Sequence, residues 1–308
     1  MIIYEPNKHF FGDLMHWAKS LVMVRLTIAV LGIGIFTALF AFLLSYYHIA
    51  EHIPKDLGTI FSFLGVVLSI LLVFRTNSAY DRWWEGRKLW GSLVNNCRNL
   101  AVQTNGFLPK DDKKTRHEMA VLISNFCSAL KDHLRNGANP DILMELNETQ
   151  LSELRSKKNI PNELSSQIHH LLISCRKNGS ISDYDLLNFK PHTQALLDIS
   201  GACERIKKTP IPFSYEIFIK MYVLIYCSLM PLTMVPLFGY WAIPFVMLVF
   251  FAFMGLEMMA AEIEDPFGFD GNDLPTGQIA KNISGDVFEI LEATKNNSEV
   301  EKLYDVVQ

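Results

Sequence analysis

Long stretches of the chain carry no charged residue, and polar, charged sequence separates them. They cover residues 26–47, 57–74 and 221–256. About 20 mainly apolar residues cross a bilayer as a helix, so each of the first two stretches predicts one membrane span. The third is long enough for two, and proline, glycine and aromatic residues at 236–241 predict a turn between them. The pattern therefore predicts four spans.

The second stretch ends in a dense run of charges and tryptophans at residues 74–87. Indole rings favour the headgroup zone, and Arg75, Arg82 and Arg87 follow the rule that basic residues mark the cytoplasmic side. We therefore expect this helix to leave the membrane at its inner face. Basic residues before the first span give the same orientation, with both termini and the long middle segment cytoplasmic.

The middle segment shows apolar residues at helical spacing and no strand-like alternation. We expect helices over 87–105, 117–134, 147–158 and 161–177, and one that Ser182 caps and that runs to about Lys207. The predicted apolar faces are Leu89, Leu93, Cys97, Leu100 and Val102 in the first helix and Met119, Leu122, Ile123, Phe126 and Leu130 in the second. The predicted fold class is all-α: a four-span integral membrane protein with a helical cytoplasmic domain.

These boundaries divide the chain into five parts. They are a cytoplasmic N-terminal segment, the first two spans, the cytoplasmic helical domain, the last two spans, and a turn with an acidic tail: residues 1–25, 26–81, 82–213, 214–262 and 263–308. Because 25 residues precede the first apolar stretch, we expect it to be a retained helix and not a cleaved signal peptide.

Composition excludes several function classes. Half of the 308 residues are hydrophobic and the net charge is −4, which gives no reason to expect a nucleic-acid partner. The 5 cysteines show no Cys-x-x-Cys spacing, so neither a zinc site nor a disulfide framework is indicated. No phosphate-binding glycine motif or nucleophile motif occurs, so we do not expect an enzyme.

The second span places Ser62, Val66, Ile70, Phe74 and Ser78 on one helical face, because they are four residues apart. Lining a pore, this face would form an apolar constriction able to gate by dewetting. Its neighbours are apolar too, so the pattern alone favours contact with lipid or with other helices for any one of these residues.

An acidic turn follows the fourth span. Clustered oxygen ligands suit Ca²⁺, although the order differs from that of an EF-hand loop. A solvated acidic cap is the alternative interpretation. The carboxylates in question are Glu262, Asp265, Asp270 and Asp273.

Three separated motifs, in the right order, resemble the bestrophin family. They are Asp81-Arg82-Trp83-Trp84 after the second span, Cys203-Glu204-Arg205 followed by Pro210-Ile211-Pro212-Phe213 before the third, and Asp265-Pro266-Phe267-Gly268 after the fourth. The resemblance covers the whole chain and is greatest to bacterial members. It implies a homopentamer in the bacterial inner membrane, with the second spans lining a narrow neck.

The resemblance also implies roles for particular residues. Val66, Ile70 and Phe74 would form the neck, and Ile181, or alternatively Tyr184, a second constriction at the cytoplasmic exit. Glu262, Asp265, Asp270 and Asp273 match the family's calcium clasp in register. Asp265 replaces an asparagine there, and Gly271-Asn272 interrupts the acidic run, which counts against calcium. No other cofactor is implied.

The sequence gives less direct evidence about which ion permeates. Animal members, which pass anions, carry aromatic rings along the neck, whereas Ile70 occupies the middle position here. Five copies of a chain with net charge −4 make an acidic assembly, which favours cations. We expect a passive channel for monovalent cations such as sodium. The alternatives are an anion channel, an ion-coupled transporter and a membrane-anchored scaffold.

Overall fold

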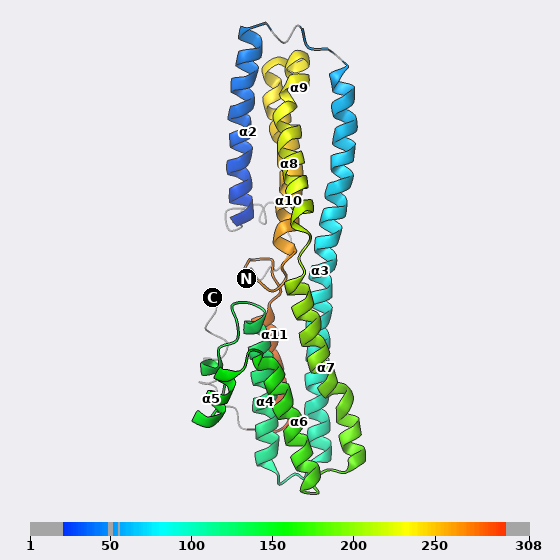
Figure 1. Ribbon diagram of the computed structural model, residues 1–308, viewed down its shortest axis with the longest axis vertical. Coiled ribbons are helices and arrows are strands. Elements are labelled where there is room, and N and C mark those ends of the chain that lie inside the picture. Colours follow the sequence, from blue (N-terminus) through cyan, green and yellow to red (C-terminus); the bar gives the residue numbers. More distant parts are fainter. Residues whose placement is uncertain (1–20, 49–51, 55, 294–308) are drawn as a thin grey trace, which may run out of the picture.

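The computed structural model describes residues 21–48, 52–54 and 56–293, and every regular element within them is a helix. The all-α prediction is confirmed for this part of the chain. The molecule is elongated, with one long helix, α3, running through both of its halves (Figure 1). Residues 1–20 of the predicted N-terminal segment and residues 294–308 of the predicted tail, all predicted to be cytoplasmic, lie outside the described residues.

The membrane half contains the apolar helices. Three stretches are long and apolar enough to cross a membrane, namely 22–46, 57–107 and 213–263. The last folds back on itself at Gly239, where φ is 58°, inside the turn predicted at 236–241. The elements of this half are α2 (Leu21–Tyr46), the first part of α3 (Leu57–Phe107), α8 (Phe213–Leu229), α9 (Pro231–Phe238), η4 (Gly239–Trp241) and α10 (Ala242–Ile263).

The other half, which the sequence predicts to be cytoplasmic and which is called the cytoplasmic half below, packs shorter helices around the rest of α3 (Figure 1). Side-chain caps set the starts of most of them: Ser182 caps α7 as predicted, together with Asp185, and at α4 Asp112 accepts the N–H of Thr115 at 3.1 Å. That second cap begins α4 four residues before the predicted start. The elements are α4 (Lys113–His133), η3 (Pro140–Ile142), α5 (Glu148–Ser156), α6 (Ile160–Lys177), α7 (Asp183–Lys208) and α11 (Thr276–Ile290).

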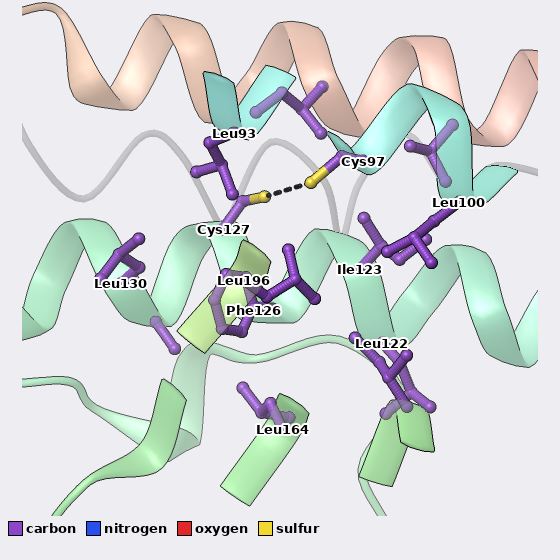
Figure 2. Packing of buried hydrophobic residues seen from close by; sticks show 14 of the residues in the cluster. Leu93, Cys97, Leu100, Leu122, Ile123, Phe126, Cys127, Leu130, Leu164 and Leu196 are labelled. Carbon is purple, nitrogen blue, oxygen red and sulfur yellow. Dashed lines mark hydrogen bonds between the residues drawn. The ribbon is translucent and has the colours of Figure 1, made fainter. Parts of the chain in front are cut away.

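A single apolar core holds this half together (Figure 2). At its centre the sulfurs of Cys97 and Cys127 lie 3.7 Å apart, and all five cysteines are buried free thiols. The predicted apolar face of α4 is buried in full. On α3 the prediction for Val102 was wrong: this side chain is exposed, because the buried face turns through Leu100 and Thr104 instead.

Helix α11 was missed in the sequence, where residues 278–308 were interpreted as a tail. It packs on α4 and α3. Ala280, Ile283 and Val287 are completely buried there. Their spacing of three and four residues is the helical signal that could have identified it.

Candidate functional site

The three predicted neck residues lie on the outer face of α3. Val66, Ile70 and Phe74 are 59%, 51% and 61% exposed, and Ser62 and Ser78 on the same face are exposed as well. The opposite face carries the buried Leu68 and Leu72, which pack with α8 and α10. The neck face is therefore turned away from its own subunit. Other apolar residues of this stretch, Phe63, Val67 and Val73, are exposed too.

Two of the three arginines at the end of this stretch make contacts within the subunit, which the sequence did not predict. Arg75 is completely buried, and its Nη2 lies 2.6 Å from Glu264 Oε2. Arg82 donates to three carbonyl oxygens, those of Glu264, Ile206 and Thr209, at 3.0, 2.6 and 2.5 Å. These bonds satisfy carbonyls at the ends of α10 and α7 and join both ends to α3.

The other residues of the Asp81-Arg82-Trp83-Trp84 motif differ in their exposure and contacts. Trp83 donates its indole N–H to the carbonyl of Asn272 at 3.2 Å. Trp84 is exposed, and its ring stacks with those of Tyr80 and Trp83. Asp81 is exposed on α3. The motif thus combines a structural clamp with an outward aromatic cluster.

A second group of charged residues lies between α8 and α10 in the membrane half. Glu257 on α10 is buried, and its Oε1 lies 3.7 Å from Lys220 Nζ on α8. Lys220 also pairs with Glu216 one turn earlier. The sequence does not reveal that Lys220 lies beside Glu257, because the two residues come from different helices.

The acidic turn after α10 is held by protein groups. Asp273 Oδ2 accepts the N–H of Asp270 at 2.6 Å, and Asp265 pairs with Lys207 at 3.0 Å. Arg135 donates to the carbonyl of Phe267 at 3.2 Å. Within the described residues no group of three or more His, Cys, Asp or Glu side chains is placed to hold a metal ion, and this includes Glu262, Asp265, Asp270 and Asp273.

Asp273 is the buried carboxyl of this turn. Burial raises its pKa to about 7, and the nearby carboxylates of Asp270, Asp265 and Glu262 act in the same direction, while the N–H of Asp270 opposes them. The turn lies close against Gly86 of α3, where an added Cβ would be 3.2 Å from Leu274 and from Phe267. The turn is therefore docked on the helix that carries the neck face.

The two candidates for the cytoplasmic constriction differ in burial. Ile181 is 5% exposed and belongs to the cytoplasmic core, whereas Tyr184, in the first turn of α7, is 81% exposed. Of the two, only Tyr184 presents its side chain at the surface of the subunit.

Comparison with known proteins identifies the family. The family model described as Bacterial/Fungal Bestrophin protein matches residues 1–289. The chain belongs to the bestrophin family. Its relatives include the voltage-dependent anion channel-forming protein of Nostoc sp., to which this bestrophin is 37% identical over 236 residues, covering 75% of this chain and 77% of the relative. A protein of the same name from Mesorhizobium japonicum is 31% identical over 309 residues, covering 98% and 97%.

Solved structures agree on the fold. A bacterial bestrophin homolog from Klebsiella pneumoniae superposes with a TM-score of 0.82 at 24% identity, over 87% of this chain and 99% of the other. The resemblance inferred from the three motifs is thus confirmed. This bestrophin is an integral membrane protein of a channel-forming family and is not an enzyme.

Proposed function

We propose that this bestrophin is a passive ion channel of five identical subunits, in which each α3 lines the conduction pathway. The observation that carries this proposal is the outward apolar face of Val66, Ile70 and Phe74 on α3. Five such faces around an axis make a narrow apolar neck. An ion crosses it only when the neck is wide enough for the ion to keep its water, so widening opens the channel.

The proposed topology has four crossings, because the third apolar stretch turns back at η4. The cytoplasmic half and both termini then face the cytoplasm, and the membrane is the bacterial inner membrane. A second constriction at the cytoplasmic end would involve Tyr184 in preference to Ile181, since Ile181 is committed to the core. No cofactor enters the proposal, and currents independent of added Ca²⁺ are the expected result.

We propose anions as the permeant class, because the relatives are named as anion channel-forming proteins. Monovalent cations are the second candidate. They are favoured by the net charge of −4 and by Ile70, which replaces an aromatic ring at the middle of the neck.

Reversal potentials of the purified protein in planar bilayers separate the two ion classes. Under a NaCl gradient, a shift toward the chloride equilibrium potential that is lost on replacing chloride with gluconate supports anions. A shift toward the sodium potential supports cations. Absence of current from well-formed pentamers would contradict the channel proposal.

Replacing Val66, Ile70 and Phe74 together with alanine tests the neck. We expect a larger single-channel conductance, because in all five subunits three bulky side chains are removed and the constriction becomes wider. The matched control replaces Ile28, Leu31 and Ile35, which are exposed on α2, and should leave conductance unchanged. Equal conductance in the neck variant and the wild type would refute the assignment.

A further inference from the structure

Tyrosine side chains of α8 hold the backbone of α3 beside the neck face. The hydroxyl of Tyr226 donates to the carbonyl oxygen of Phe61 at 3.2 Å, and the hydroxyl of Tyr222 donates to that of Leu64 at 3.0 Å. Both carbonyls belong to α3 and lie within about one and a half turns of Val66, the first residue of the neck face. A carbonyl oxygen has two lone pairs, so each tyrosine adds a bond between the helices without removing one from α3.

A glycine makes room for Tyr226. An added Cβ at Gly65 would lie 2.6 Å from Tyr226 Oη and 3.3 Å from its Cζ. The tyrosine is buried, and its ring packs against those of Phe61 and Phe253 at centroid distances of 5.6 and 5.8 Å. Because other rings hold Tyr226 on both sides, a side chain at position 65 would displace α3.

Gly65 lies on the side of α3 that faces α8, and the neck residues lie on the opposite side. A helix turns by about 100° per residue, which places Gly65 roughly 140° around α3 from the mean direction of the three neck residues. An α-helix whose backbone bonds are all made moves as one rigid element. A push on α3 away from Tyr226 therefore moves the neck residues toward the axis of the channel, whereas a bond to Tyr226 holds them back from it.

We propose that Tyr226 and Tyr222 are positioning residues of the neck, which hold α3 against α8 and thereby set the width of the constriction. This inference rests on the proposed channel function. The neck faces are apolar, so water favours their closing on one another, and bonds that hold each α3 back oppose this closure. Tyr215 lies 3.5 Å from the carbonyl oxygen of Leu71, a long contact that contributes less.

Single-channel conductance of the full chain in planar bilayers tests the contact between Gly65 and Tyr226. Gly65→Ala presses on the hydroxyl, moves α3 toward the axis and should lower the conductance of each open channel by about twofold or more. Tyr226→Phe should cause a smaller reduction, and the double variant should return to the level of Tyr226→Phe alone, because the crowded oxygen is gone. Gly58→Ala is the matched control, since nothing lies within 4 Å of its added Cβ, and should equal wild type.

The conductance of an open channel does not depend on how much of the protein folds, so a loss of stability alone would leave it unchanged. The positioning role is overturned if Gly65→Ala conducts as wild type does. It is also overturned if the double variant is as impaired as Gly65→Ala, because the effect of the alanine would then not act through Tyr226.

The two hydroxyls are tested without any crowding by Tyr222→Phe combined with Tyr226→Phe. This variant keeps the packing of the rings and loses both bonds to α3, so conductance should fall by about twofold or more. The control combines Tyr46→Phe with Tyr240→Phe, both at exposed positions, and should match wild type. Wild-type conductance without the two hydroxyls would contradict the proposal.

Crosslinking at the neck separates this inference from the channel proposal, because it requires no current. With Val66→Cys in every subunit, oxidation by air and a copper catalyst joins neighbouring subunits, while the native cysteines are buried. Adding Gly65→Ala should speed the crosslinking, because α3 moves inward, and adding Tyr226→Phe as well should slow it again. If this pattern occurs without any current, the positioning role stands and the channel proposal fails. If currents are normal and the rate does not change, the positioning role is overturned.

Discussion

The two ends of α3 use apolar side chains in opposite ways. In the membrane half, Val66, Ile70 and Phe74 point outward, and Leu68 and Leu72 are the buried residues of that stretch. In the cytoplasmic half, Trp90, Leu93 and Cys97 point inward to a core, and the outer face is mostly polar. One helix therefore meets two solvents, and only where water is the solvent does an apolar side chain identify the buried face.

The largest expected effect on stability comes from comparing alanine substitutions at Trp90 and Phe74. Trp90→Ala should lower the free energy of unfolding by about 3–5 kcal/mol, because it leaves a cavity in a closed core. Phe74→Ala should change the stability of the subunit by less than about 1 kcal/mol, because the ring is exposed. Denaturant unfolding of both variants in detergent measures this. Equal losses would show that the neck face is packed as tightly as the core.

The difference between the two ends of α3 also explains which buried residues could be predicted from the sequence. On α4 all five predicted apolar positions are buried, but this helix is enclosed by its neighbours, and the polar residues Ser124, Asn125 and Lys131 are buried as well. In the first part of α3 every face is apolar, and no pattern distinguishes Leu68 from Val66. Helix α11 had a readable pattern at Ile279, Ile283 and Val287 and was missed because its position near the end of the chain suggested a tail.

The clamp between the halves could not be predicted for another reason. Arg75 and Arg82 were interpreted only as basic residues that mark the cytoplasmic side of the span. Their partners, Glu264 and the carbonyls of Ile206 and Thr209, follow more than a hundred residues later. Backbone carbonyls leave no mark in a sequence, so only the fold reveals that three helix segments meet at Arg82.

Substitution of Arg82 should have the next largest effect on stability, because this side chain joins the two halves of the molecule. Arg82→Ala removes three charged hydrogen bonds and should lower the free energy of unfolding by about 3 kcal/mol. Arg82→Lys should recover little of this, because one ammonium group does not reach three carbonyls as the planar guanidinium does. Arg87→Ala, at an exposed position one turn further, is the control and should stay within about 0.5 kcal/mol of wild type. A full rescue by lysine would contradict the clamp.

The smallest expected effect is the difference in stability between alanine substitutions at two glycines in the cytoplasmic part of α3. A Cβ at Gly86 would lie 3.2 Å from Leu274 and from Phe267 of the acidic turn, whereas at Gly91 the nearest atom is Arg87 Nη1 at 3.6 Å. Alanine is the better helix former by about 0.5–1 kcal/mol, so Gly91→Ala should stabilise the protein by that amount. Gly86→Ala should instead cost about 1 kcal/mol, because crowding outweighs the helix gain. Thermal unfolding of both variants gives the sign. A stabilising Gly86→Ala would mean that the turn after α10 does not dock closely on α3, and the link from the acidic turn to the neck helix would then depend on Trp83, Arg82 and Arg75.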